Sequence, residues 1–218
     1  MTHGLAGVAD AGAFLARLTR LDPQAPVRLR SAGGRTALWA RLPWQVLVTR
    51  EVAGPGPGDV TVSAAELLAV LGRGGDELPA RRDADWRWPL PPPGPTVVET
   101  VAAAELSRLA EAAAGTLREV SAGGISGRAV GQRAVRDALL DHVALVVTPA
   151  SGGPVEVSQR LVQAVLRMGF LGPAGVDSPD SRVCVTGRWV GISAPYGVAW
   201  LQKVKELTVM PIASHPKG

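Results

Sequence analysis

The sequence predicts an α+β fold in which two similar units each combine antiparallel strands with amphipathic helices packed on the sheet. Two internal echoes lead to this prediction. Residues 36–52 align without a gap with residues 188–204, and residues 62–74 align in the same way with residues 157–169. Two such echoes indicate an internal duplication.

A proline-rich stretch is the third observation. Residues 89–95 contain five prolines and one glycine. Proline lacks the amide donor and fixes φ, so the stretch is expected to form neither a helix nor a paired strand. A polyproline II ligand has the same pattern, but a stiff linker is the favoured interpretation. The sequence therefore predicts an N-terminal unit over residues 1–88 and a C-terminal unit over residues 96–218.

The first echo has the pattern of two strands joined at a bend. Both copies place an apolar residue, a proline, an aromatic ring, one spacer and a valine in the same order, as Leu42–Val46 and Ala194–Val198. A proline inside an extended run removes a ladder donor and so marks a bend or a sheet edge. Trp44 and Tyr196, which follow the two prolines, are therefore expected to project from the domain.

The N-terminal unit is predicted to begin with a helix and to continue as a meander of strands. Asp10 is a candidate N-cap for a helix that runs through about Leu21, because Phe14 and Leu18 recur at helical spacing. The further expected elements are a strand at Val27–Arg30, the first hairpin copy, a loop at residues 54–58, a strand at Asp59–Ser63, a helix at Ala64–Arg73 capped by Ser63, and a strand at Trp86–Trp88.

The C-terminal unit is predicted to alternate strands and helices before it ends in the second hairpin copy. Thr100 is a candidate cap for a helix with an apolar stripe that includes Ala103, Leu106 and Ala110. The further expected elements are a strand at Val97–Thr100, a helix at about Arg128–His142, a buried strand at Val143–Val147, a helix after Ser158, and a strand at Leu207–Met210.

The composition bounds the compartment and the chemistry. With 218 residues, of which 46% are hydrophobic, the chain is long enough to bury its own core. The single cysteine, Cys184, lies between valines, so we expect a buried, slowly reacting thiol and neither a disulfide nor a cysteine zinc site. No run reaches the ~20 apolar residues of a membrane helix, and the N-terminus lacks the features of a signal peptide. These observations predict a cytoplasmic protein without membrane contact.

The net charge of +4 raises the question of nucleic-acid binding. All but three of the 23 basic residues are arginine, and Ala, Gly, Pro and Val are abundant, which is typical of a GC-rich bacterial genome. Acidic residues are interspersed with the basic ones, so the sequence shows no concentrated patch for phosphates. Nucleic-acid binding is therefore an alternative that we do not favour.

No stretch carries a catalytic, metal or nucleotide signature, so no cofactor is predicted. His142 follows Asp141 directly, and on a helix the two side chains point about 100° apart, which excludes the orienting pair of a triad. The segment Gly123–Arg128 resembles a phosphate-cradling loop in outline but lacks the Walker residues. A plain loop is favoured, although it is our first choice for an anion site, with candidate residues Gly123, Gly124, Ser126, Gly127 and Arg128.

The aromatic residues point to an interface. The chain has six Trp but only two Phe and one Tyr, and Trp and Tyr commonly anchor protein interfaces. Core packing explains some of these rings, and a stacking platform for single-stranded nucleic acid is the less favoured alternative. The candidate interface residues, all within the hairpin echoes, are Trp39, Trp44, Trp189, Tyr196 and Trp200.

Repeated strand–helix–strand units of this kind resemble, in topology, the sliding-clamp fold, and residues 60–68 before a hairpin region are the local likeness. No functional residue carries over from this resemblance. The sequence favours a non-catalytic interaction or scaffold protein, oligomeric, with a protein partner or itself as the ligand. The first alternative is a nucleic-acid-binding protein, and the second is a small-molecule binder or an enzyme with a site between the two units.

Overall fold

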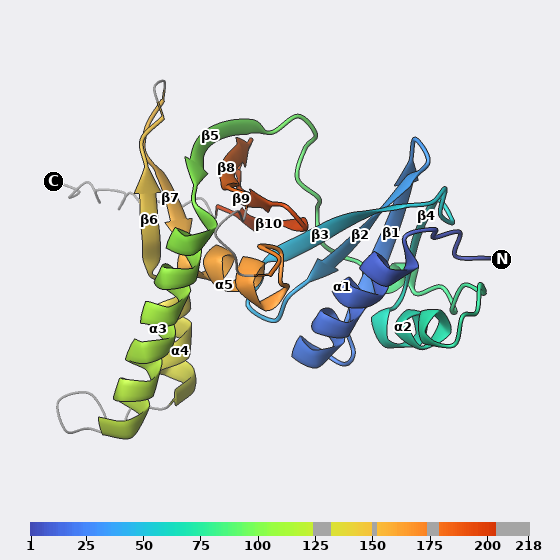
Figure 1. Ribbon diagram of the computed structural model, residues 1–218, viewed down its shortest axis with the longest axis horizontal. Coiled ribbons are helices and arrows are strands. Elements are labelled where there is room, and N and C mark those ends of the chain that lie inside the picture. The colour runs from blue at the N-terminus through green and yellow to red at the C-terminus, as the bar shows by residue number, and fades with distance from the viewer. Residues whose placement is uncertain (124–131, 150–151, 174–178, 204–218) are drawn as a thin grey trace, which may run out of the picture.

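The computed structural model describes residues 1–123, 132–149, 152–173 and 179–203. Its main element is an eight-stranded antiparallel sheet with the strand order β4-β1-β2-β3-β10-β9-β8-β5, and β6 and β7 form a separate two-stranded sheet (Figure 1). The strands are β1 (Pro26–Ala32), β2 (Arg35–Arg41), β3 (Leu47–Ala53), β4 (Asp59–Ser63), β5 (Thr96–Val101), β6 (Val143–Val147), β7 (Val155–Ser158), β8 (Ser181–Thr186), β9 (Trp189–Ala194) and β10 (Gly197–Gln202). The predicted α+β class is confirmed.

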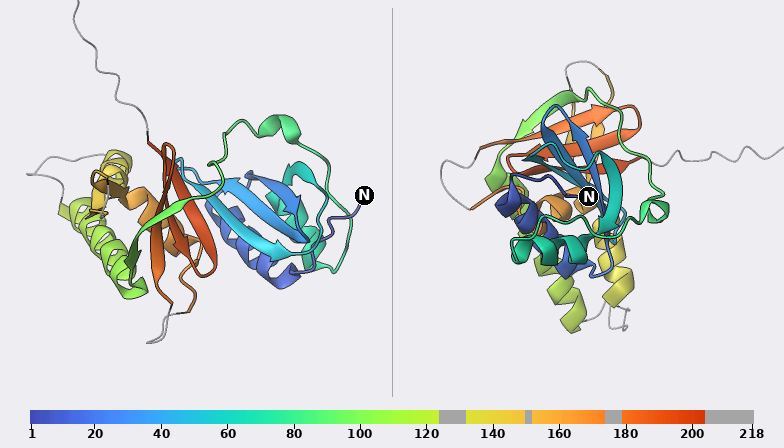
Figure 2. Two further views of the ribbon diagram at one scale, coloured as in Figure 1. Left: turned by 90° about the horizontal axis from the view of Figure 1, so that it is seen from above. Right: turned by 90° about the vertical axis from the view of Figure 1, so that its right-hand side faces the viewer.

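The helices gather on one side of the eight-stranded sheet (Figure 2). They are α1 (Val8–Leu21), α2 (Ala64–Gly72), α3 (Ala103–Gly123), α4 (Gln132–Asp141) and α5 (Gln159–Arg167). The main core lies between the helices and the sheet, because every second strand residue points to the helices. In this core the rings of Phe14 and Phe170 stack with centroids 6.4 Å apart, which joins α1 to the segment after α5.

The two halves of the sheet are related by an approximate two-fold axis at the pairing of β3 with β10. Val48 pairs with Ala199, and on either side of this pair Leu47 faces Trp200 and Thr49 faces Val198. Exchanging the two halves therefore maps this ladder onto itself. The exchange also relates the outer strands β4 and β5 and the helices α1 and α5, which each precede a three-strand meander.

The hairpin echo is structural, but its gapless alignment shifts by one residue at the turn. In the first copy Arg41 pairs with Leu47, and the Leu42 amide donates to the Val46 carbonyl at 2.8 Å around a three-residue loop. In the second copy Ala194 pairs with Gly197 around a two-residue loop. A shift of one residue moves a strand's side chains to the other face. The second strands of the two copies therefore match with an offset of one.

The strand–helix echo has the same local form in both copies. Ser63 and Ser158 cap α2 and α5, since their hydroxyls accept hydrogen bonds from backbone amides in the first helical turn. Gly74 and Gly169 follow the helices with φ values of 71° and 65°, as left-handed C-terminal residues do. The position in the fold differs, however, because β7 pairs with β6 outside the main sheet, and the counterpart of β4 there is β5.

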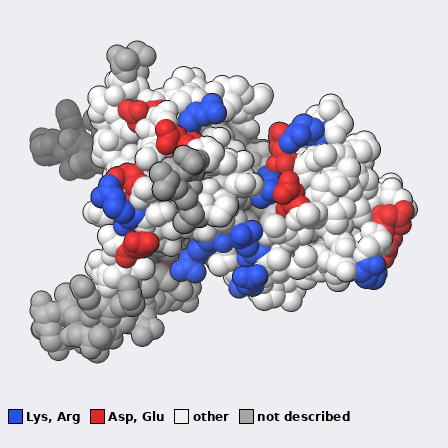
Figure 3. Space-filling model, in the orientation of Figure 1, with Lys and Arg blue, Asp and Glu red and all other residues white. Residues whose placement is uncertain are grey.

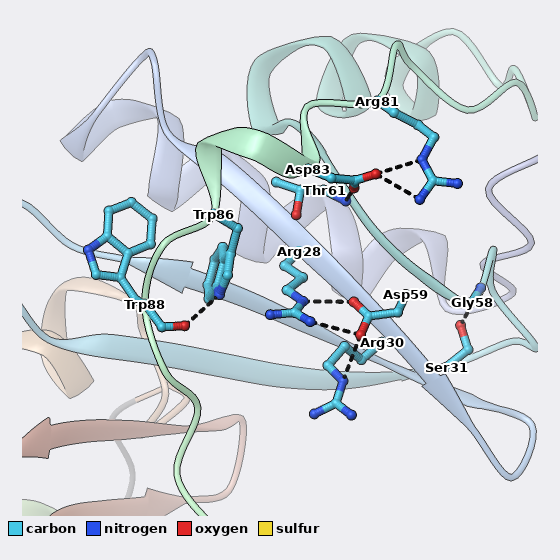
Figure 4. A network of polar contacts seen from close by, with 10 residues as sticks. All are labelled: Arg28, Arg30, Ser31, Gly58, Asp59, Thr61, Arg81, Asp83, Trp86 and Trp88. Carbon is cyan, nitrogen blue, oxygen red and sulfur yellow. Dashed lines mark hydrogen bonds and ion pairs between the residues drawn. The ribbon is translucent and has the colours of Figure 1, made fainter.

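The segment that joins the halves crosses the face of the sheet opposite the helices. The Thr61 amide donates to the Asp83 carboxylate (Figure 4). The Arg82 amide donates to the Thr61 carbonyl at 2.7 Å, so β4 is hydrogen-bonded to this segment in both directions. Trp86 and Trp88 then pack with buried residues of both halves, namely Leu47, Cys184, Trp189 and Trp200. The prediction of a strand at Trp86–Trp88 is therefore wrong. The two tryptophans instead anchor the crossing segment to the sheet.

Several smaller predictions are wrong. Asp10 does not cap α1, because the helix begins at Val8 after Gly7. Thr100 lies in β5, three residues before the first residue of the helix it was expected to cap. The strand Val143–Val147 is only partly buried, since Val146 is 54% exposed and Val147 alone is fully buried. The predicted strand Leu207–Met210 lies outside the described residues.

Candidate functional site

Trp44 joins the first hairpin to a helix of the other half. Its position after Pro43 places the ring beside the start of α5, where its Nε1 donates to the Arg160 carbonyl at 3.2 Å. Arg160 returns the contact, because its Nη1 donates to the Trp44 carbonyl at 2.7 Å. The ring is half-buried against the main core. This reciprocal pair fixes the loop against α5.

Arg160 is held from a second side by Asp141 at the end of α4. The Arg160 Nε donates to an Asp141 carboxylate oxygen at 2.6 Å. This hydrogen bond holds the pKa of Asp141 below its usual range, with the guanidinium charge acting in the same direction and partial burial opposing it. Arg160 thus links a hairpin loop, α4 and α5, and little of its charge is left for an external ligand.

The Trp44 loop forms one wall of a groove between the two halves, with a volume of about 570 Å³. The groove has an apolar floor, amide groups and an arginine rim. The N-terminal half contributes Arg20, Leu21, Pro43, Trp44 and Gln45, and the C-terminal half contributes Ala113, Ala114, Asp137, Leu139, Leu140, Gln159, Arg160, Gln163 and Arg167. In Figure 3, basic side chains gather between α1 and the pair α3 and α4 with no acidic side chain visible among them.

Two arginines of the groove have free charges. Arg20 lies at the exposed end of α1 and Arg167 in the last turn of α5. Within the described part of the chain, neither side chain pairs with a carboxylate. Both lie where a helix C-terminus favours a cation. Arg17 lies close by over Gly169, as a Cβ on that glycine would be 2.6 Å from its Nε.

Tyr196 occupies the corresponding place in the second hairpin, with a different environment. Its backbone amide donates to the Phe170 carbonyl at 3.0 Å, and its ring lies over the Arg50 guanidinium at 5.2 Å. Arg50 is itself buried and donates to Asp10 of α1 at 2.5 Å. Tyr196 remains 42% exposed. Tyr196 therefore projects from the surface, as the sequence predicts.

The other predicted interface rings do not reach the surface to the same extent. Trp189 and Trp200 are buried, at 7% and 6% exposure, on the face covered by the crossing segment, so they pack within the chain. Trp39 is partly buried beside them. Successive residues of a strand point to opposite faces of the sheet. The helices cover one face of the central strands and the crossing segment covers the other, so rings on either face are buried.

The predicted anion loop lies almost entirely outside the described residues. Gly123 is the last residue of α3, and Gly124, Ser126, Gly127 and Arg128 are not described. The basic site that the structure brings together instead uses Arg20, Arg160 and Arg167, which sequence reasoning missed. They come from α1 and α5, which are far apart in the chain. The one signal in the sequence is that Arg160 and Arg167 are seven residues apart and so lie on the same face of a helix.

Cys184 is buried, at 3% exposure, as predicted, and burial raises the pKa of its thiol. Within the described segments no helix is both long and apolar enough to cross a membrane. The same segments contain no group of three or more His, Cys, Asp or Glu side chains placed to hold a metal ion.

Comparison with known families gives a family without an assigned activity. The model named Domain of unknown function (DUF8185) matches residues 90–206, more than half of the chain. The chain belongs to the DUF8185 family. A second model, Domain of unknown function (DUF8010), matches residues 3–89, so the two matches meet inside the crossing segment of this DUF8185 protein. No curated protein matches the chain.

Solved structures with a similar fold include bacterial sliding clamps. The DNA polymerase III subunit beta from Pseudomonas aeruginosa has a TM-score of 0.53 at 12% identity, over 93% of this chain and 64% of the clamp. The Helicobacter pylori beta clamp in complex with carprofen has a TM-score of 0.56 at 11% identity, over 97% and 67%. The same clamp bound to a DNA ligase peptide has a TM-score of 0.52 at 12% identity, over 93% and 65%. The DUF8185 chain thus shares the clamp fold but spans slightly less than two thirds of the Pseudomonas protein.

Proposed function

We propose that this protein is a non-catalytic scaffold that binds a partner protein in the groove between its two halves. The observation that carries the proposal is the combination of an apolar floor with two arginines, Arg20 and Arg167, whose charges no carboxylate of the described residues neutralises. Exposed unpaired charges beside apolar surface are typical of a recognition site, because they select a partner electrostatically while burial supplies affinity.

Structures with the same fold support the proposal in a general way. One Helicobacter pylori clamp is bound to a DNA ligase peptide, so this fold presents a peptide-binding surface in at least one relative of similar architecture. We include a cytoplasmic location and self-association in the proposal. Tyr196, exposed on the other hairpin, is the residue that we assign to contacts between copies.

Photo-crosslinking in the native cells tests the groove. A photoreactive amino acid replaces Gln45, which lines the groove, and in a control replaces Arg188, which is exposed in the turn between β8 and β9. We expect discrete protein adducts from position 45 that disappear when Arg20→Glu and Arg167→Glu are added. Adducts of equal pattern at both positions, or adducts that survive charge reversal, would contradict the proposal.

A second candidate function is nucleic-acid binding, which the same arginines and the net charge of +4 favour. Such binding weakens steeply as salt increases, since each neutralised phosphate releases counterions. Titration with a labelled single strand and a labelled duplex at two salt concentrations distinguishes the two functions. Affinity that falls steeply with salt, and that Arg20→Glu with Arg167→Glu abolishes, would establish nucleic acid as the ligand in place of a protein.

A further inference from the structure

We infer that the segment bound in this groove is a short, acidic stretch of a partner protein with at least one bulky apolar side chain. The inference rests on the proposed function and adds the chemical class of the partner. It follows from three features of the groove: which charges are free, what forms the floor, and how large the space is.

The free charges of the groove are positive. Among the described residues, three arginines and one aspartate line it, which gives a net charge of +2 (three minus one). Arg160 is engaged by Asp141 and by the Trp44 carbonyl, so it forms part of the wall. Arg20 and Arg167 remain, and they come from α1 and α5 on different halves. Guanidinium groups bind carboxylates with two parallel hydrogen bonds, so two acidic side chains fit this pair.

The floor of the groove is suited to an apolar side chain. Leu21, Leu139 and Leu140 are half-buried, and the half-buried Trp44 ring closes one side. Gln159 and Gln163 also line the groove, but their Nε2 groups donate to carbonyls of α3 at 3.3 and 3.4 Å and so hold the wall in place. An aliphatic or aromatic side chain set on this floor buries apolar surface that water otherwise contacts.

The size of the groove and the charges around it favour a peptide over the alternatives. A volume of about 570 Å³ accommodates a few side chains. A nucleic-acid duplex is typically held by about six to ten phosphate contacts, whereas the described residues of the groove offer two free arginines. The chain's own residues 204–218 contain Lys205 and Lys217 against one acidic residue, Glu206, so their charge does not complement the groove. An acidic segment of another protein is the occupant that matches all three features.

Selection from a library of random twelve-residue peptides displayed on phage tests the inference. The bait is the full-length protein, and the matched baits are the Arg20→Glu, Arg167→Glu double variant and the Arg188→Glu control. Circular dichroism and thermal unfolding establish that all three are folded. We expect peptides with two or more acidic residues and a bulky apolar residue, and we expect the double variant to bind them at least tenfold more weakly than the wild type and the control do.

The outcomes separate the inference from the proposed function. Peptides that depend on Arg20 and Arg167 but lack acidic residues would overturn the inference and leave the groove as a protein-binding site. Failure to select any peptide, or equal binding to the double variant, would overturn both. If a selected acidic peptide is displaced by a single-stranded oligonucleotide of sixteen thymidines at equimolar concentration, the groove prefers polyphosphate, and the inference is again wrong.

Discussion

The loops of the two hairpins differ in length by one residue, and their aromatic rings make different contacts. Each loop places an aromatic ring after a proline, on the side of the helix that precedes the three-strand meander of the other half. Trp44 meets the start of α5 through two hydrogen bonds with Arg160. Tyr196 is linked to α1 indirectly, through Arg50 and Asp10, and the residue is 42% exposed. The Trp44 ring therefore connects the two halves within the chain, whereas Tyr196 is partly exposed to solvent.

The difference originates in loop length. The first loop contains Gln45 as an additional residue, and its backbone takes the left-handed conformation with φ of 71°. A left-handed residue after a turn is the usual way to close a three-residue hairpin loop. The shorter second loop has no counterpart of Gln45, and Gly197 pairs directly with Ala194. Trp44 and Tyr196 are aligned in the sequence, but the additional residue in the first loop accompanies a half-buried tryptophan, and the shorter loop a partly exposed tyrosine.

Replacing each ring by alanine is expected to give the largest contrast. Trp44→Ala removes a half-buried ring and the hydrogen bond to the Arg160 carbonyl, and should lower the free energy of unfolding by about 2–3 kcal/mol. Tyr196→Ala removes a partly exposed ring that lies over the Arg50 guanidinium and against Gly172, and should cost about 1 kcal/mol or less. Denaturant unfolding of both variants measures the difference, and equal costs would show that the two loops are equivalent after all.

Association of the same variants tests the interface hypothesis separately. If Tyr196 anchors a contact between copies, its truncation should weaken that association by about 2 kcal/mol or more while the fold remains intact. Sedimentation across a range of concentrations measures this. A Tyr196→Ala protein that associates as the wild type does would remove Tyr196 from the proposed interface.

The sequence was sufficient to predict most elements because their signals are local. The serine caps, the positive-φ glycines and the alternating strands depend on neighbouring residues, and the hairpin and strand–helix forms were recovered in both copies. The position of Cys184 among valines predicted its burial for the same reason.

The placement of elements could not be predicted, because it depends on pairings between distant residues. The gapless alignment matched Val48 with Trp200, yet the former faces the helices and the latter the opposite side. Only the hairpin pairing reveals the one-residue shift. The groove was missed for a related reason, since Arg20 and Arg167 become neighbours only when β3 pairs with β10.

The second loop should tolerate no side chain at Gly197. A Cβ there would lie 2.6 Å from the Phe170 ring and 2.7 Å from the Thr49 carbonyl oxygen, both of which are fixed by the core. Gly197→Ala should therefore destabilise the protein by about 2 kcal/mol. Gly12→Ala in α1 is the matched control, because a Cβ there meets nothing within 4 Å, and it should stabilise the helix by up to about 1 kcal/mol. Thermal unfolding of the two variants should shift in opposite directions, and a neutral Gly197→Ala would mean that the second loop relaxes easily.

The smallest expected effect concerns Gln45, the residue that distinguishes the loops. A left-handed backbone costs a residue with a side chain about 1 kcal/mol or more, whereas glycine adopts it freely. Glycine also gains freedom in the unfolded chain, which offsets part of this advantage. Gln45→Gly should therefore stabilise the protein by about 0.5 kcal/mol, while Gln45→Ala, which keeps the strain, should not. Because Gln45 is exposed, loss of its side chain should affect stability little by itself. Denaturant midpoints for the two variants at equal slope decide the matter: if alanine stabilises as much as glycine, backbone strain is not what the extra residue contributes, and the contrast between the loops must come from the Trp44–Arg160 contacts alone.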